Sequence, residues 1–434
     1  MKLKSFVDKI QGLRFVLEKM PLASGSAWRF LLEENILEAE DKIQESYRNL
    51  DFFLHIDEKR HQMMIKHLCS LHDITNTLVN LQKGKVLDDI ELYEIKHLAY
   101  ISINISKILN DYEIRNLNSA QKAFEILDPY KNKQDSFYVY DIYDDKLAEY
   151  RKRKQIEESI EEERVVLTKL SSKLRFFSDN LQSLLKELLE IDVIQAKAVL
   201  YKTYHFIRPL FNQKGSINIK GMYNPAVRER VGEQVYQPVD ICLSKGIPSF
   251  LIGMNMGGKT VTLNTIFLIQ LLAQMGFGCP AEEIETEICS FLSGYNSDNN
   301  EKKEGYSSFA NELLSLDEII TSSITQRQSK HLSLIVIDEP ARTTNPTEGS
   351  ALVKGLVKTL CNDETYLIVA THYNVQMDGC KYLRVKGLTK AGVDYHIEEV
   401  SNTEVPNEAI SVAEMVKVSP LWINNSKQYL ANAE

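Results

Sequence analysis

The spacing of hydrophobic and polar positions divides the chain near residue 214. No Gly or Pro occurs between Pro129 and Pro209, and apolar residues in this stretch recur at alternating steps of three and four. These positions form a heptad seam in which Glu163 is the one polar member. The apolar members are Ile160, Leu167, Leu170, Leu174, Phe177, Leu181, Leu184, Leu188 and Ile191. The pattern predicts one long coiled-coil-like helix of about 30 residues.

Helical periodicity also fills the region before this seam. Apolar residues recur at helical spacing around 5–20, 28–55, 60–82 and 90–126. We therefore expect an all-α domain over residues 1–205.

After residue 214 the sequence pattern changes: glycines become frequent, and short β-type runs alternate with helical runs. The expected strands are 217–219, 249–252, 284–291, 332–337 and 366–370, with a hairpin of 382–386 and 393–400. This alternation predicts an α/β domain over residues 206–406, followed by a helical segment over residues 407–434.

A glycine-rich loop follows one of the expected strands. Residues 253–260 read Gly-Met-Asn-Met-Gly-Gly-Lys-Thr, the spacing of a phosphate-binding (Walker A) loop. Gly257 and Gly258 let backbone N–H groups approach a phosphate without an intervening side chain. Lys259 adds a positive charge for the β- and γ-oxygens, and the Thr260 hydroxyl can ligate Mg²⁺. The loop predicts that the chain binds a nucleoside triphosphate.

A second motif supplies carboxylates. The apolar run 332–337 is followed by Asp338 and Glu339, as expected of a Walker B strand. In phosphate-loop enzymes the first carboxylate holds Mg²⁺ and the second polarises the attacking water. The run 366–370 ends in Thr371 and His372, and the histidine is a candidate sensor of the γ-phosphate.

Composition narrows the class of protein only moderately. The formal net charge is −9, and most of the excess negative charge lies after residue 214, so the chain lacks an overall basic nucleic-acid footprint. The six cysteines are scattered without C-x-x-C pairs, which argues against a zinc site or a disulfide framework. No apolar run approaches the roughly 18 residues of a membrane helix. The N-terminus lacks the apolar core of a signal peptide, so we expect a cytoplasmic protein.

Together these motifs resemble the MutS family, whose ATPase domain is of the P-loop, ABC type. Residues 253–260 are similar to the family loop G-P-N-M-G-G-K-[ST], with Met254 in place of proline. Residues 305–312 are similar to its signature loop, 338–349 to its Walker B region and 370–373 to its A-T-H-Y switch. The continuation over 260–281 is closest to the branch that does not perform classical mismatch repair. The resemblance is strong over 217–434 and looser over 1–216, which it identifies with the core and lever helices.

The resemblance implies a role for each matching residue. Phosphate contacts would come from Asn255, Met256, Gly257, Gly258, Lys259 and Thr260, with Thr260 and Asp338 at the Mg²⁺. Glu339 would activate water, His372 would read the γ-phosphate, and Tyr236 would stack on the adenine. Ser307 would complete the ATP site of the partner subunit, in a homodimer or a dimer with a MutS-like paralogue. The helical segment after residue 406 would pair the two subunits.

Two departures from the family pattern concern the rate of hydrolysis. Ala341 and Thr343 stand where glycines are usual, and residues 296–303 differ from the usual loop before the signature. The chain also has no F-x-E mismatch wedge, and about 205 residues before the ATPase are too few for the recognition and connector domains as well as the core. We therefore do not expect mismatch reading.

Two hypotheses for the target of the motor remain open. In the first, a reduced dimeric clamp closes on DNA. In the second, the motor remodels a protein, as do short MutS-like reactivating factors of cobalamin-dependent aminomutases. The first rests on family membership alone, whereas the neutral helical region and the acidic ATPase domain favour the second.

Overall fold

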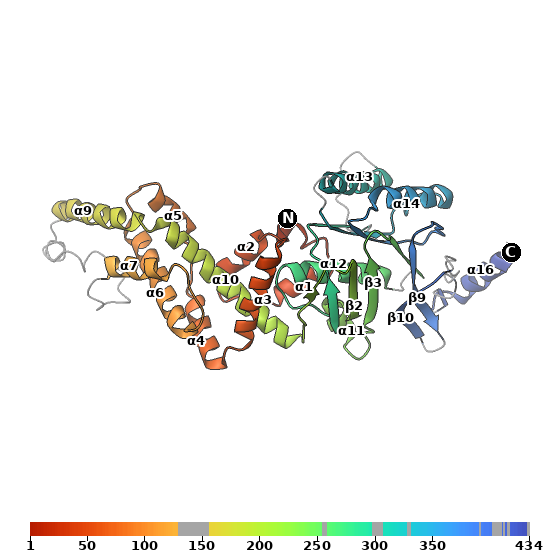
Figure 1. Ribbon diagram of the computed structural model, residues 1–434, viewed down its shortest axis with the longest axis horizontal. Coiled ribbons are helices and arrows are strands. Elements are labelled where there is room, and N and C mark those ends of the chain that lie inside the picture. The colour runs from red at the N-terminus through yellow and green to blue at the C-terminus, as the bar shows by residue number, and fades with distance from the viewer. Residues whose placement is uncertain are drawn as a thin grey trace. The chain divides into compact units, whose positions relative to one another are not determined.

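The computed structural model describes residues 1–128, 156–253, 258–296, 307–327, 331–389, 392–401, 410, 413–414 and 417–431. The chain is a mixed α/β protein with two compact units (Figure 1). The sheet unit contains Met1–Met20, Asn35–Arg48 and Leu200–Glu434, and the helical unit contains Pro21–Glu34 and Asn49–Val199. Neither unit is contiguous in sequence.

The helical unit consists of helices, as the apolar periodicity predicts. Its complete helices are α2 (Gly25–Glu33), α4 (Glu58–Leu68), α5 (Thr75–Gln82), α6 (Asp89–Leu109), α7 (Leu117–Leu127) and α9 (Ile156–Arg175). The unit boundaries fall within α3 (Glu40–Leu54) and α10 (Ser178–Thr203). Asp88 begins α6 with a capping box, in which its carboxylate accepts from the N–H of Glu91 and the Glu91 carboxylate accepts from the N–H of Asp88.

The heptad seam is buried, but it does not form one continuous helix. Its members from Leu170 to Ile191 are fully or nearly fully buried apart from Phe177, which is half-buried. The helix is interrupted at Phe176–Phe177, between α9 and α10. The Phe177 N–H donates to the Leu174 carbonyl three residues back instead of four. The prediction of a single long helix is therefore wrong at this point, whereas the predicted buried face is confirmed.

The sheet unit is built around a six-stranded sheet in the order β10-β9-β4-β8-β7-β6. Its strands are β4 (Ser249–Ile252), β6 (Phe291–Asn296), β7 (Ser333–Asp338), β8 (Thr365–Ala370), β9 (Lys381–Thr389) and β10 (Gly392–Glu399). All neighbours are parallel except the β9–β10 hairpin. The carboxyl ends of β4, β7 and β8 consequently meet at one edge of the sheet, where ligands bind in open α/β sheets.

Helices cover both faces of this sheet (Figure 1). Helices α13 (Ser308–Arg327) and α14 (Pro346–Leu360) pack on one face, where alternate strand residues such as Ile335 and Ile337 join the apolar core. Helix α12 (Lys259–Gln274) packs on the other face and is buried along almost its whole length. Burial on both faces explains why the central strands are continuous apolar runs.

A second, four-stranded sheet has the order β1-β5-β2-β3. Its strands are β1 (Leu210–Phe211), β2 (Ser216–Met222), β3 (Val239–Ser244) and β5 (Glu283–Thr286). The single strand predicted over 284–291 is wrong, because the chain leaves this sheet after β5 and enters the large sheet at β6. Between them, side chains of α12 replace the strand ladder: Gln270 donates to the Glu287 carbonyl and Gln274 accepts from the Cys289 N–H.

The N-terminal segment belongs to the sheet unit and packs on α12. It contains a short 3₁₀ helix, η1 (Leu3–Ser5), and α1 (Leu13–Glu18). The ring of Phe6 lies 5.7 Å from that of Phe267, and the Gln11 N–H donates to Asn264 over 3.3 Å. The remaining helices of the unit within the described residues are α11 (Pro225–Val231) and α16 (Pro420–Ala431). No helix in the described part of the chain is long and apolar enough to cross a membrane.

Candidate ATP site

Strand β4 and helix α12 flank the predicted phosphate loop. Met254, Asn255, Met256 and Gly257 lie outside the described residues, so their predicted phosphate contacts stay predictions. The two ends of the loop are described. Gly253 has φ +140° and Gly258 has φ +82° directly before the first turn of α12. Both values favour glycine, and α12 begins directly after Gly258, so its N-terminus is available to an anion bound by the loop.

Lys259 extends back across this turn. Its ammonium donates to the Gly253 carbonyl over 2.9 Å and lies 3.7 Å from Oε1 of Glu339. The side chain is 4% exposed. Burial lowers the pKa of Lys259 below its usual range, although the carboxylates of Glu339 and Asp338 oppose this shift. The ammonium is thus held between a carbonyl and a carboxylate, in a position that phosphate oxygens can compete for.

Thr260 and Asp338 are in direct contact. The Thr260 hydroxyl donates to Oδ2 of Asp338 over 2.6 Å, which joins the first turn of α12 to the carboxyl end of β7. Hydroxyl and carboxylate oxygens suit Mg²⁺, which is usually bound by one or two protein oxygens together with phosphates. The described residues contain no group of three or more His, Cys, Asp and Glu side chains that could hold a metal by themselves. This pair therefore fits a Mg²⁺ that is held jointly with a nucleotide.

Glu339 is the residue after the end of β7 and has an unusual backbone. Its φ is +46°, and its N–H donates to the carbonyl of Ala370 at the end of β8 over 3.0 Å. Its side chain is 14% exposed, and its carboxylate lies 3.7 Å from the ammonium of Lys259 and 3.6 Å from Nε of Arg342. A left-handed conformation at a non-glycine residue is costly, and here it directs the carboxylate toward the phosphate loop.

His372 follows β8 at the same edge of the sheet. Its ring is partly buried and lies 4.2 Å from the ring of Tyr373. Burial lowers the pKa of His372; Glu339 opposes the shift, and Lys259 and Arg342 add to it. The imidazole is therefore neutral near pH 7, so it can exchange hydrogen bonds with a phosphate without adding a charge.

The sequence did not reveal the side chains that hydrogen-bond the loop after Glu339. The Glu312 carboxylate, from α13, accepts hydrogen bonds from the N–H groups of Ala341 (2.5 Å) and Arg342 (3.4 Å). The Tyr373 hydroxyl donates to the Ala341 carbonyl over 2.5 Å. Glu312 and Tyr373 were visible within the family-like motifs, but nothing in the spacing indicated that both contact this loop.

Ala341 explains why the family pattern has a glycine at its position. Its φ is +61°, a left-handed conformation, and its side chain is buried. Thr343, the second departure, is not among the described residues with positive φ. Only the first departure therefore places strain in the loop.

Tyr236 and Ser307 lie outside the contacts that join Lys259, Thr260, Asp338 and Glu339. The Tyr236 hydroxyl accepts from the Asn224 N–H over 2.9 Å at the start of α11. Ser307 is exposed, and its hydroxyl accepts from the Ala310 N–H over 3.2 Å in the first turn of α13. The stacking role of the tyrosine and the action of the serine in a partner's site stay predictions.

A further aromatic residue lies beside the phosphate loop. A Cβ built on Gly258 would come 3.1 Å from Cδ1 of Tyr395, so this ring on β10 packs directly against the glycine. The Tyr395 N–H donates to the side chain of Gln237 over 3.0 Å. No sequence motif indicated this contact, because it depends on the β9–β10 hairpin lying beside β4.

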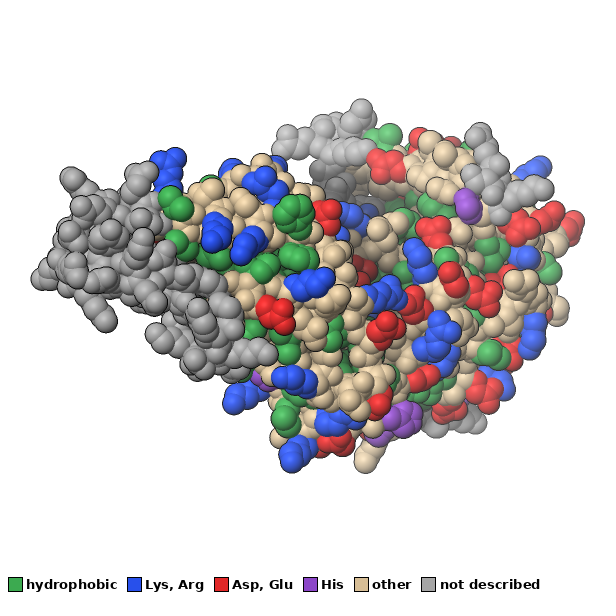
Figure 2. Space-filling view, turned by 60° about the vertical axis from the view of Figure 1, so that its left-hand side comes forward, with side chains coloured by type: hydrophobic (Ala, Val, Ile, Leu, Met, Phe, Trp, Pro, Cys, Tyr) green, Lys and Arg blue, Asp and Glu red, His purple; other side chains and the backbone are tan. Residues whose placement is uncertain are grey.

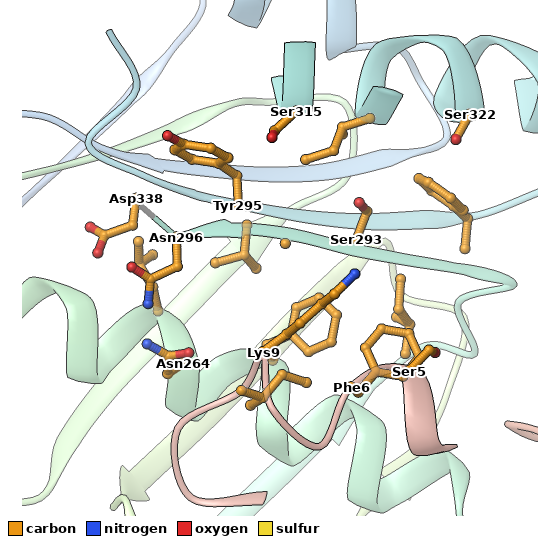
Figure 3. Close-up of a pocket in the computed structure, with 18 of the residues that line it drawn as sticks. Ser5, Phe6, Lys9, Asn264, Ser293, Tyr295, Asn296, Ser315, Ser322 and Asp338 are labelled. Atoms are coloured by element: carbon orange, nitrogen blue, oxygen red, sulfur yellow. The ribbon is translucent and has the colours of Figure 1, made fainter. Parts of the chain in front are cut away.

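A cavity of about 390 Å³ opens next to Asp338, bounded by the N-terminal segment, α12, β6, β7 and α13 (Figure 3). Asn264, Asn296 and Asp338 form its polar end, and the side chain of Lys9 extends into it. Asn296 is the register partner of Asp338 across β6 and β7. The polar surroundings of the carboxylate thus extend beyond the predicted motif residues.

Comparison with known proteins agrees with this geometry. The family model described as MutS domain V matches residues 249–421. Endonuclease MutS2 of Halalkalibacterium halodurans is 31% identical over 241 residues, 55% of this chain and 29% of that protein. Endonuclease MutS2 of Caldicellulosiruptor saccharolyticus is 31% identical over 211 residues (48% and 25%). Endonuclease MutS2 of Clostridium botulinum is 30% identical over 256 residues (58% and 31%).

The matched regions thus cover less than a third of the length of these relatives. The matched residues include β4, β7 and β8. Lys259 follows β4, Asp338 ends β7 and His372 follows β8. Residues 249–421 of the chain are therefore similar to MutS domain V, and the relatives named above are MutS2 proteins.

Proposed function

We propose that the chain is a Mg²⁺-dependent ATPase that hydrolyses ATP at a composite site between two subunits and uses the cycle to act on DNA. One observation supports the ATPase best. Lys259, Thr260, Asp338 and Glu339 come from two separate motifs and contact one another at the carboxyl edge of a parallel sheet. A positive charge, a hydroxyl and two carboxylates in this arrangement serve phosphoryl transfer to water.

The contacts of Lys259 suggest how ATP would start the reaction. The γ-phosphate competes with Glu339 for the Lys259 ammonium, which releases the Glu339 carboxylate toward water. Glu339 then accepts a proton as the water oxygen bonds to the γ-phosphorus and the bond to the β,γ-bridging oxygen breaks, giving ADP and phosphate. When bound, Mg²⁺ neutralises charge on the β- and γ-oxygens. The neutral His372 ring would hydrogen-bond the γ-phosphate.

Dimerisation is supported by two features of the described surface. Ser307 caps α13 and is exposed, so its hydroxyl faces solvent at the start of the signature helix. Helix α16 exposes Leu421, Trp422 and Tyr429 at 71%, 65% and 79%. Large apolar side chains grouped on one short helix favour burial against a partner. These features agree with a site completed in trans and a C-terminal pairing segment.

DNA is the target we favour, because the similar relatives are named endonucleases. The charge distribution favours the alternative, reactivation of a cobalamin-dependent aminomutase, but none of the relatives reported above is named for that activity. The experiment compares ATP hydrolysis with duplex, branched and single-stranded DNA over a range of salt concentrations, with Lys259→Ala as the inactive control. We expect stimulation that weakens as salt rises. Hydrolysis that ignores every DNA would contradict the DNA role, and hydrolysis that persists in Lys259→Ala would contradict the assigned site.

A further inference from the structure

The outward face of α9 is basic over its last three turns. Between Arg164 and Ser178 the chain contains four basic residues and no carboxylate. Lys169, Lys173 and Arg175 are all exposed. The opposite face of α9 is buried, because Leu170, Ser171 and Leu174 pack into the helical unit. On the helical wheel, Lys169 and Lys173 lie at one margin of the exposed half of α9 and Arg175 lies at the other.

The loop after α5 adds two more cations to this face. A Cβ built on Gly84 would come 2.8 Å from Nη2 of Arg175, so the guanidinium lies directly against this glycine. The neighbours Lys83 and Lys85 are exposed. Within the described residues, neither lysine nor Arg175 takes part in an ion pair. The α5–α6 loop therefore adds Lys83 and Lys85 to the side of α9 on which Arg175 lies.

Two carboxylates next to these cations in sequence are hydrogen-bonded to neutral groups within the helical unit. Asp179 accepts a hydrogen bond from the Gln82 amide over 2.8 Å, and Asp88 caps α6. Toward the left of Figure 2, the visible surface carries several Lys and Arg side chains and fewer Asp and Glu. The local charge suits a polyanion despite the acidic composition of the chain.

An aromatic ring projects beside these cations. Phe176, next to Arg175 at the interruption between α9 and α10, is 88% exposed. Its neighbour Phe177 turns inward, half-buried, with the Lys122 ammonium 5.9 Å from its ring centre. The helix interruption thus separates two adjacent phenylalanines, and it presents one of them to solvent among cations.

We propose that Lys83, Lys85, Lys169, Lys173, Arg175 and Phe176 form a basic–aromatic surface that binds a DNA strand with unstacked bases. The cations contact successive phosphates, and the Phe176 ring stacks on a base. An exposed ring reaches a base face only where the base is unpaired or splayed, so single strands and branch points fit better than intact duplex. This inference rests on the proposed DNA role and names where the DNA is bound.

Fluorescence anisotropy on the full chain tests the surface, with labelled oligothymidylate of about 20 nucleotides and a duplex of equal length. Phe176→Ser should weaken single-strand binding by roughly 5- to 150-fold, the equivalent of about 1–3 kcal/mol for one stacked base, with little effect on the duplex. Phe176→Trp should retain binding. The double variant Lys169→Gln, Lys173→Gln should reduce the slope of log affinity against log salt by about 1.4.

The control is Lys107→Gln, an exposed lysine near the far end of α6, which should leave both affinities unchanged. Equal single-strand binding by Phe176→Ser and the wild type would overturn the surface, and so would an equal loss in the control. In either case wild-type DNA binding would leave the proposed function intact. A wild-type chain that hydrolyses ATP but binds neither DNA would overturn both proposals. Thermal melting of each variant confirms that the unit is folded.

Discussion

The carboxyl edge of the large sheet and the exposed face of α9 are two regions that carry chemistry in different ways. At the sheet edge, functional groups are buried and specified by motif: Lys259 is 4% exposed and is fixed by two partners. On α9, the functional groups are exposed, and Phe176 is 88% solvent-accessible. Chemistry at the sheet edge depends on fixed distances between buried groups. Binding at α9 depends on the summed charge of several cations and on the exposed ring of Phe176.

The difference explains why the two regions tolerate change differently. In a buried site, removal of one partner leaves another charge unsatisfied, so effects are large and specific. On a solvated surface each cation contributes little, and only the sum produces affinity. Substitutions at the sheet edge should therefore produce large individual effects, and single cation changes on α9 should produce small ones.

Glu339→Gln should have the largest effect on turnover. The amide cannot accept the proton from water, so kcat for ATP hydrolysis should fall by about 10²–10⁴, while ATP binding is retained and the dimer is trapped. Single-turnover hydrolysis and equilibrium nucleotide binding measure the two quantities. Asp363→Asn, an exposed change in the loop after α14, is the matched control. Unchanged turnover in Glu339→Gln would remove the carboxylate from the water-activating role.

Glu312→Ala should have an intermediate effect, because it removes the acceptor of two backbone N–H groups in the loop after β7. Loss of a buried acceptor costs roughly 1–3 kcal/mol of unfolding free energy. Denaturant unfolding should show this loss, and turnover should fall because Glu339 is less well placed. Asp317→Ala, an exposed change on the same helix, should show neither. Identical unfolding curves for both variants would contradict the supporting role of Glu312.

Ala341→Gly should stabilise the protein. A left-handed alanine costs about 1–2 kcal/mol relative to a permitted conformation, and glycine removes that cost at φ +61°. The unfolding midpoint should therefore rise. Thr343→Gly gives the comparison, since its backbone is not among those with positive φ, and there we expect no gain. An equal shift in the two variants would contradict the strain assigned to Ala341.

The smallest expected effect concerns pH. Burial lowers the pKa of His372 in the folded protein, so the unfolded chain takes up its proton first as pH falls. Above the ordinary histidine pKa, the imidazole is neutral in both the folded and the unfolded chain and does not affect stability. Below that pKa the unfolded chain binds the proton more readily, so the free energy of unfolding decreases as pH drops. Between about pH 7.5 and about pH 5.5, His372→Gln should lose less stability than the wild type. Parallel stability profiles would contradict a buried neutral imidazole.

The sequence also predicted the two regions to different extents. The strands that carry Asp338 and His372 were predictable because both faces of the sheet are buried, which leaves continuous apolar runs and terminal polar residues. The contacts of Glu312 and Tyr373 with Ala341 were not, since they join α13 and the end of β8 to a loop distant in sequence. The strand predicted over 284–291 was wrong because Gln270 and Gln274 satisfy the intervening backbone from α12.

The helical unit was harder to predict in functional terms. The heptad pattern identified the buried face of α9 and α10, because periodicity reports burial. It could not locate the interruption at Phe176, which leaves the seam in register. Nor could it show that Gly84, between Lys83 and Lys85, packs against Arg175, since that contact arises from packing between helices.

The most direct test of the central claim, an ATP site shared between two subunits, is hydrolysis by mixed dimers. Lys259→Ala removes the phosphate-loop charge of one chain. Ser307→Asp keeps the cap of α13 and places a carboxylate against the partner's phosphates. Each variant alone should be inactive, whereas an equimolar mixture should recover roughly a quarter of the wild-type rate, because mixed dimers contain one intact site. A mixture no more active than its components, or full activity of Ser307→Asp alone, would contradict the shared site.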